Sequence, residues 1–203
     1  MAVIHHTTMT PGKLELLTSW LPRQPWYEAK SQPRLEKVGG FRLDDPAGEV
    51  GIECMIVADL ADDDVAVYFL PLAYRGSPLP GADSALIGTS EHGVLGLRWI
   101  YDGACDPVVL AQLRALCVGD ATAQAQSESN TRDATVLVVS ARDGGSTAAA
   151  LAQAEVTIVR VLSTPIPDAE LTGAVAHVST GWQLPDGSRQ TGLVLALQPL
   201  TPR

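Results

Sequence analysis

The stretch VGIECMIVADLADDDVAVYFLPLAYR, residues 50–75, holds two long apolar runs separated by an acidic segment. Both runs are rich in β-branched and aromatic side chains, which predicts strands near residues 49–59 and 64–74. The acidic segment, residues 62–64, lacks the later glycine and glutamate of a calcium-binding loop, and we interpret it as a hairpin tip. The stretch therefore predicts an antiparallel hairpin and, with it, an antiparallel sheet.

The residues on either side extend this hairpin into a meander. Turns are expected at Gly39-Gly40 and at residues 46–48, because glycine and proline interrupt the apolar pattern there. The further strands expected in this part of the chain are residues 2–8, 34–38, 41–45 and 94–101.

Two helices are expected around the meander. KLELLTSWL, residues 13–21, places its leucines at helical spacing and is stopped by Pro22. DPVVLAQLRAL, residues 106–116, has Asp106 in the N-cap position, Pro107 in the first helical position and a glycine beyond its end. Both segments therefore predict helices that flank the sheet.

A change of composition divides the chain. Residues 118–134 are polar, small and nearly free of large apolar side chains, which favours a boundary there between a unit of residues 1–120 and a unit of residues 121–203. The expected fold class is α+β: an antiparallel sheet with two flanking helices, followed by a small, mostly antiparallel sheet with one helix. The strands expected in the second unit are residues 135–141, 155–163, 177–184 and 190–200, and its helix is residues 167–175.

Charge and composition narrow the class of partner. The 203-residue chain has a net charge of −9, so we expect neither a nucleic-acid backbone nor an anionic membrane surface as its partner. Its three cysteines, Cys54, Cys105 and Cys117, form no CxxC pair, which predicts free buried thiols in a reducing cytoplasm. No apolar run approaches the roughly 18 residues of a membrane-spanning helix. We therefore expect a cytoplasmic protein.

The sequence lacks the motifs of common catalytic sites. It contains no HExxH, no GxSxG, no Ser-His-Asp ordering and neither of the common glycine-rich phosphate loops. His5 and His6 are adjacent on an expected strand, so their side chains leave opposite faces and cannot chelate one metal together. His92 stands beside a glycine at a turn and is interpreted as a hydrogen-bonded loop residue. We expect no metal, no cofactor and no catalytic residue.

One charged residue lies inside a second apolar run. EVTIVRVLS, residues 155–163, predicts a buried or half-buried strand with Arg160 in its middle. A cation in that place needs a carboxylate partner, a bound anion or a route to solvent. The residues by themselves leave these three possibilities open.

The order of the segments resembles a known family. LELLTSWLPRQPWYEAKSQ (14–32), the hairpin of residues 50–75 and GVLGLRWIYDGACDPVVLAQLRAL (93–116) are similar to parts of the N-terminal cap of actinobacterial maltokinases and related kinases. VIHHTT (3–8) and GGFRLDDPAGEVG (39–51) resemble standalone proteins called maltokinase N-terminal cap-like. The resemblance implies a cap-like domain over residues 1–120.

The second half resembles, more loosely, the small ATP-binding lobe of the same kinases. Arg160 occupies the position of the family's nucleotide-binding lysine, and Glu170 occupies the position of the glutamate that pairs with this lysine. The resemblance implies a structural ion pair between Arg160 and Glu170, with a phosphate-binding or an outward-facing Arg160 as alternatives. The family's catalytic loop and metal-binding acidic motif have no counterpart in the sequence, which implies a pseudokinase-like shape without kinase chemistry.

Three functions follow as hypotheses. The first is a non-catalytic binding or regulatory protein, not an enzyme, whose partner is an enzyme of maltose, trehalose or α-glucan metabolism, because the resembled caps belong to kinases of that metabolism. The second is a sensor of a sugar or nucleotide that uses the groove between the two units. The third is an enzyme with an unrecognised site. Glucan branching is argued against, since it needs a barrel of about 250 residues with paired carboxylates.

Overall fold

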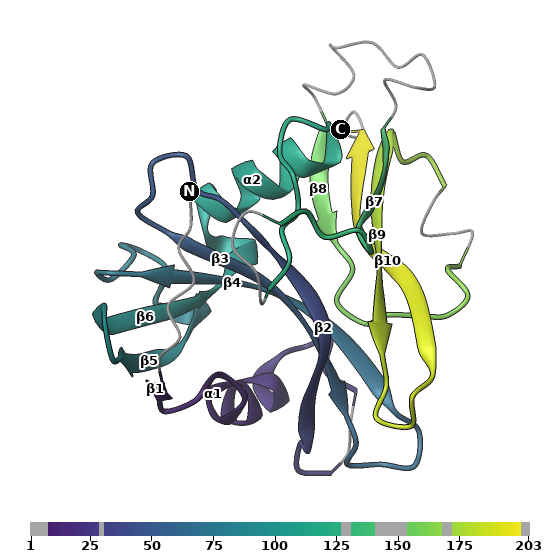
Figure 1. Ribbon diagram of the computed structural model, residues 1–203. Helices are drawn as coiled ribbons and strands as arrows, with labels where there is room; N and C mark the ends of the chain where they lie inside the picture. The colour runs from purple at the N-terminus through teal and green to yellow at the C-terminus, as the bar shows by residue number, and fades with distance from the viewer. Residues whose placement is uncertain (1–7, 29–30, 127–130, 141–153, 168–171, 200–203) are drawn as a thin grey trace.

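The computed structural model describes residues 8–28, 31–126, 131–140, 154–167 and 172–199. These residues form a strongly curved sheet flanked by two short α-helices (Figure 1). Every described strand pair is antiparallel. The α+β class expected from the sequence is confirmed.

The sheet has the strand order β1-β5-β6-β4-β3-β2-β9-β10-β8, and β7 pairs with β9 beside this path. The helices are α1 (Lys13–Trp20) and α2 (Pro107–Cys117), with 3-10 turns η1 (Leu21–Arg23), η2 (Asp83–Ala85) and η3 (Gly103–Cys105). The strands are β1 (Met9–Thr10), β2 (Leu35–Leu43), β3 (Gly51–Asp59), β4 (Ala66–Arg75), β5 (Leu86–His92), β6 (Gly96–Asp102), β7 (Leu137–Ser140), β8 (Ala154–Ile158), β9 (Ala176–Gln183) and β10 (Arg189–Pro199).

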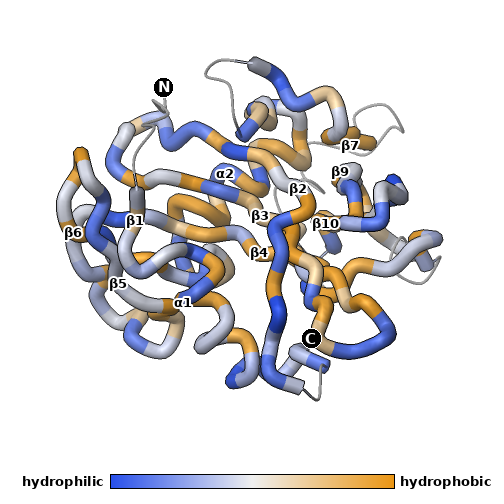
Figure 2. The backbone as a smooth tube through the Cα atoms, turned by 60° about the horizontal axis from the view of Figure 1, so that its bottom comes forward, coloured by the Kyte–Doolittle hydropathy of each residue, from blue (hydrophilic) through white to orange (hydrophobic). Residues whose placement is uncertain are grey.

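The β3–β4 hairpin is the centre of the sheet. Its two strands pair without a register shift from Gly51 opposite Tyr74 to Asp59 opposite Ala66, which confirms the hairpin expected from the sequence. Both of its faces are covered, because alternate side chains of each strand enter different apolar clusters. Figure 2 shows the hydrophobic segments, in orange, along this central hairpin.

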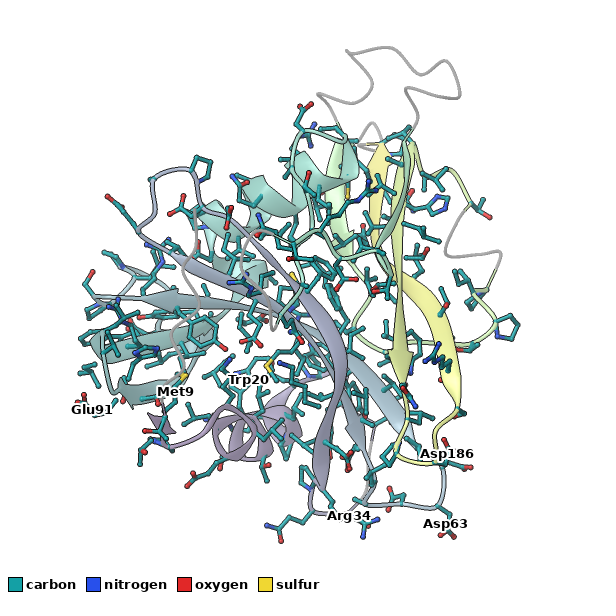
Figure 3. The ribbon with its side chains drawn as sticks, viewed as in Figure 1. Met9, Trp20, Arg34, Asp63, Glu91 and Asp186 are labelled. Atoms are coloured by element: carbon teal, nitrogen blue, oxygen red, sulfur yellow. The ribbon has the colours of Figure 1, made fainter. Side chains whose placement is uncertain are left out.

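Each face of the hairpin packs against one helix. Leu17 and Trp20 of α1 join the cluster on one face, and Figure 3 shows Trp20 between the helix and the sheet. Val109 and Leu113 of α2 join the cluster on the other face. The Asp106 side chain caps α2 by accepting hydrogen bonds from the backbone N–H groups of Val108 (2.9 Å) and Val109 (3.3 Å), as the sequence predicted.

The turn expected at Gly39-Gly40 is wrong, because both glycines lie inside the single strand β2. A Cβ on Gly39 would lie 2.9 Å from the Cβ of Trp182 on the neighbouring β9. Gly40 has a φ of +126°, and a Cβ there would lie 2.2 Å from the carbonyl oxygen of Cys54. The two glycines therefore permit close approach of neighbouring backbone rather than a reversal of the chain.

The sequence prediction also missed β5, which it treated as a connection. Ile87 and Ser90 are buried, and the Ser90 hydroxyl donates a hydrogen bond to the carbonyl oxygen of Pro11 at 2.7 Å. At Gly88 an added Cβ would come within 2.7 Å of the Leu16 side chain on α1. Small and polar residues thus fit this strand closely against α1, and they hide the apolar alternation that usually marks a strand.

The strands of the second half do not form a separate sheet. Trp182 of β9 pairs with Gly39 of β2, and β10 and β8 follow β9 in the same sheet. One apolar cluster contains side chains from β2, β3, β9, β10 and α2 together. The boundary near residue 120 stays a prediction. Residues 2–7 of the expected strand 2–8 and residues 168–171 of the expected helix 167–175 lie outside the described residues. The described residues 172–175 contain a turn rather than the expected helix.

The chain returns to the central hairpin immediately after β8. The Val159 N–H donates to the carbonyl oxygen of Val194 at 3.0 Å, which continues the pairing with β10. The N–H of Phe69 on β4 then donates to the carbonyl oxygen of Arg160 at 3.0 Å, and the Leu162 N–H donates to the carbonyl oxygen of Val67 at 2.8 Å. Residues 160–162 therefore join the second half to β4, in addition to the pairing of β9 with β2.

Replacing Gly40 by alanine tests the close approach inside β2. We expect Gly40→Ala to lower the free energy of unfolding by about 3 kcal/mol or more, because it adds a steric clash to an unfavourable φ. Gly48 has a φ of +73° with open space around it, so Gly48→Ala is the matched control and should cost about 1 kcal/mol. Urea unfolding of both variants measures the difference, and equal losses would contradict the role given to Gly40.

Candidate functional site

A pocket of about 490 Å³ opens on the α1 side of the sheet. Its walls come from the N-terminal end of α1, from β2, β3 and β4, and from the β5–β6 hairpin. Among its described lining residues, only Gln126 comes from beyond residue 120. The pocket therefore lies mainly within the first expected unit rather than in a groove between the two units.

The floor of this pocket is the carboxylate of Glu53 on β3. Glu53 lies on the same face of the strand as Met55, which α1 covers, and the helix begins at Lys13 beside it. The Glu53 side chain is 9% exposed and forms ion pairs with Lys13 and, at 3.1 Å, with Lys37. Where α1 no longer covers β3, this face of the strand therefore carries the buried carboxylate of Glu53 instead of an apolar side chain. The ammonium groups of Lys13 and Lys37 lie beside it.

Four donors satisfy the two oxygens of Glu53. Oε2 accepts hydrogen bonds from Lys13 Nζ and from the hydroxyl of Tyr74 at 2.8 Å. Oε1 accepts from Lys37 Nζ at 3.1 Å and from Gln126 Nε2 at 3.3 Å. A buried carboxylate with this many donors is held in one position, and so are the side chains that donate to it.

The same contacts set the ionisation of the site. Burial by itself raises the pKa of Glu53, but the charges of Lys13 and Lys37 outweigh it and hold this pKa below the ordinary value of 4.5. Burial, followed by the neighbouring Glu53 charge, raises the pKa of Tyr74 well above its ordinary value. At neutral pH the floor of the pocket is therefore an ionised carboxylate bound to two ammonium groups and a neutral phenol.

The rim of the pocket contains His92 and Arg98 of the β5–β6 hairpin. His92 Nδ1 accepts hydrogen bonds from the backbone N–H groups of Val94 (3.3 Å) and Leu95 (3.1 Å), which agrees with the loop role expected for it. Arg98 donates from Nη2 to the carbonyl oxygen of Leu95 at 2.8 Å. Its Nε is buried, and no hydrogen-bond partner for it occurs within the described part of the chain.

Arg160, which the sequence singled out, lies outside the lining of this pocket. Its Nη2 donates to both carboxylate oxygens of Asp102 on β6, at 2.7 and 2.6 Å. The guanidinium also lies over the ring of Trp26, 5.1 Å from its centroid. Of the three possibilities left open by the sequence, the structure therefore gives Arg160 a carboxylate partner.

The expected pair between Arg160 and Glu170 stays a prediction. Glu170 lies outside the described residues, and the carboxylate that contacts Arg160 belongs to the cap-like half of the chain. The two side chains of the Arg160–Asp102 pair are 12% and 10% exposed, so the charges are largely removed from water. The pair thus links the second half of the chain to β6, whereas the backbone of residues 160–162 meets β4.

The sequence analysis missed Glu53. A charge inside an apolar strand needs a partner, and this requirement was applied only to Arg160. The run IECMIVA, residues 52–58, carries a single carboxylate, and the same requirement would have singled out Glu53. Its lysine partners are separated from it in the chain by 40 and 16 positions, so the sequence gave no local sign of them.

Several smaller expectations can be compared with the structure. Cys54 and Cys117 are free and buried, as expected, whereas Cys105 is free but exposed. His5 and His6 lie outside the described residues. Among the residues that are described, no three His, Cys, Asp or Glu side chains are grouped so that they could hold a metal ion. No described helix combines the length and the apolar character needed to cross a membrane.

Replacing Glu53 by glutamine tests its electrostatic role. Because the pKa of Glu53 is lower in the folded protein, its ionised form stabilises the fold above about pH 4.5, and this stabilisation is lost as the pH falls through the folded-state pKa. We expect Glu53→Gln to cost about 1–3 kcal/mol at pH 7, since its lysine partners are partly exposed, and less in acid. Urea unfolding between pH 3 and pH 7 measures this, with the exposed Glu49→Gln as control. A cost independent of pH would contradict the assignment.

A double-mutant cycle tests the Arg160–Asp102 pair. We expect Arg160→Met and Asp102→Asn each to cost about 2–4 kcal/mol, because each leaves one largely buried charge without its partner. The double variant should recover at least about 1 kcal/mol relative to the sum of the two single losses. The same cycle with Glu170→Gln is the comparison. Coupling to Glu170 in place of Asp102 would support the pair expected from the sequence.

The comparison with known proteins agrees with the resemblance noted in the sequence. Among curated proteins, none matches the chain. The family model described as the maltokinase N-terminal cap domain matches residues 20–106, which run from the end of α1 to the N-cap of α2 and include Glu53 and Asp102. The match covers less than half of the 203 residues and does not reach Arg160. Residues 20–106 are thus similar to a maltokinase N-terminal cap domain, as the sequence predicted.

Proposed function

We propose that this chain is a non-catalytic, cap-like binding protein that associates with an enzyme of maltose, trehalose or α-glucan metabolism. The observation that carries the proposal is the match of residues 20–106 to the maltokinase N-terminal cap domain. A cap is an accessory part of a kinase, so a chain that carries one is suited to work beside an enzyme of related metabolism. The proposed partner is a protein, and neither nucleic acid nor a membrane is part of the proposal.

The surface best suited to this association is the tip of the β5–β6 hairpin, which we define as Val94, Leu95 and Leu97. These three side chains are 62%, 44% and 40% exposed, and all lie inside the matched segment. Apolar side chains gathered on one projecting turn are typical of a surface that another protein covers.

The tip is held in shape before any partner arrives. The imidazole of His92 and the guanidinium of Arg98 bind backbone groups of Val94 and Leu95 from both ends of the turn. A turn fixed in this way loses little conformational entropy on binding, so more of its apolar contact area contributes to affinity. The exposed apolar area and its rigid support together favour the β5–β6 tip as the docking surface.

The absence of kinase activity belongs to the same proposal. If residues 121–203 resemble a kinase small lobe, Arg160 takes the position of the nucleotide-gripping lysine. Its guanidinium is already bound to Asp102 and stacked on Trp26, which supports a structural role for it. The two buried free thiols are in keeping with a reducing cytoplasm as the place where the protein acts.

Substitution of the β5–β6 tip tests the association. We expect the purified chain to bind at least one member of a panel of purified enzymes of maltose, trehalose and α-glucan metabolism in biolayer interferometry. The double variant Val94→Ser/Leu97→Ser should weaken this binding about tenfold or more, because it removes apolar area from the centre of the contact.

The control is Val65→Ser at the tip of the β3–β4 hairpin. Val65 is 42% exposed and lies outside the proposed surface, so its replacement should leave binding unchanged. Circular dichroism spectra of the variants must match that of the parent chain. Failure to bind any enzyme of the panel would contradict the proposed function, and equal weakening by the Val65 and tip variants would contradict the proposed surface.

A further inference from the structure

The pocket around Glu53 is positively charged in an acidic protein. Four cations and three carboxylates line it, which gives a net charge of +1 there, whereas the whole chain carries −9. The cations are Lys13, Lys37, Arg42 and Arg98, and the carboxylates are Asp45, Glu49 and Glu53. A local excess of cations against the charge of the whole molecule favours a negatively charged ligand.

Two of the three carboxylates are already occupied by the protein. Glu53 accepts from four side-chain donors, as described above. Asp45 is buried and accepts from the backbone N–H groups of Ala47 (3.0 Å), Glu49 (2.9 Å) and Val50 (2.9 Å). Their lone pairs are directed at these donors, so a ligand in the pocket meets the cations rather than these carboxylates.

The cations, in contrast, retain donors. An ammonium group has three N–H donors, and Lys13 and Lys37 each direct one of them at Glu53. Their side chains are 34% and 37% exposed, which leaves the ammonium groups accessible from the pocket. The buried Nε of Arg98 has no hydrogen-bond partner in the described part of the chain, although an unpaired buried donor is costly.

The pocket is large enough for more than an inorganic ion. Its volume of about 490 Å³ lies in the range of sites for small organic ligands. Met9, Tyr74 and Leu95 also line the pocket and add apolar wall beside the cations. Such a site suits a molecule with an anionic head and an organic body.

We propose that this pocket binds a small organic oxyanion, either a phosphate monoester or a carboxylate. Lys13, Lys37 and Arg98 donate to the anionic oxygens, and Glu53 holds the two lysines in position without contacting the ligand. This site does not rest on the proposed association with an enzyme, because its binding groups are the cations of the pocket, although Arg98 also contacts the backbone of the tip.

Three aromatic probes of similar size test the proposal. Phenyl phosphate and benzoate carry the two oxyanions, and benzyl alcohol is the neutral control. We expect one or both anions to raise the melting temperature and to give a binding isotherm in titration calorimetry, at a constant ionic strength kept with sodium chloride. Binding of phenyl phosphate alone identifies a phosphate ester as the ligand class, and binding of benzoate alone identifies a carboxylic acid.

Arg98→Gln is the diagnostic variant, since it removes the donor that lacks a partner. We expect it to raise the Kd for the bound anion about tenfold. Lys37→Gln is a second variant with the same expected direction, and the exposed Arg189→Gln, outside the pocket, is the matched control. The proposal is overturned if neither anion binds, if benzyl alcohol binds as well as the anions, or if Arg189→Gln weakens binding as much as Arg98→Gln does.

Discussion

The contact between residues 160–162 and β4 is the constraint on which the rest of the structure depends. Two backbone hydrogen bonds join this segment to the central hairpin, and the Arg160–Asp102 ion pair forms beside them. Asp102 is the last residue of β6, and η3 and the start of α2 follow it directly. The position of α2 on one face of the sheet, and that of the second half along its edge, are therefore fixed by one local arrangement.

An ion pair removed from water in this way does not stabilise a fold by its charge alone. The cost of desolvating both groups is offset only when the geometry and the additional contacts are good. Arg160 has both carboxylate oxygens of Asp102 within 2.7 Å and the ring of Trp26 against its guanidinium. Trp26 in turn packs against Trp20 of α1 and against Tyr68 of β4. Arg160 thus contacts the carboxylate at the end of β6 and an aromatic ring on the α1 face of the central hairpin, which specifies how the two halves of the chain meet.

Local signals in the sequence were sufficient for the central hairpin and for α2, where apolar runs, turn residues and a capping residue act within a few positions of each other. They were insufficient where the role of a residue depends on a neighbour that is distant in the sequence. Gly39 marks a turn by its local context, yet its role is to let Trp182 approach from another strand. The segment around Arg160 was predicted as a strand, but β8 ends at Ile158, before Arg160. Asp102 could not be predicted as its partner, because nothing in the sequence marks their proximity. Glu53 was overlooked because the apolar residues around it resemble an ordinary buried strand.

The Arg160–Asp102 pair and the ion cluster of Glu53 differ in what surrounds them, and this difference separates a structural pair from a proposed binding site. Arg160 and Asp102 are both largely buried, and the guanidinium lies over the ring of Trp26. Glu53 is equally buried, but its lysine partners reach it from a pocket and remain about one third exposed. The Arg160–Asp102 pair lies outside the lining of the pocket, so we expect its energetic effect to be on folding. An ion cluster with exposed cations keeps unsatisfied donors facing solvent, and water there can be displaced by a ligand whose oxygens make the same hydrogen bonds in a drier environment. The cap-like half of the chain thus combines a rigid floor, accessible cations and an apolar wall, which are the physical requirements of a recognition site.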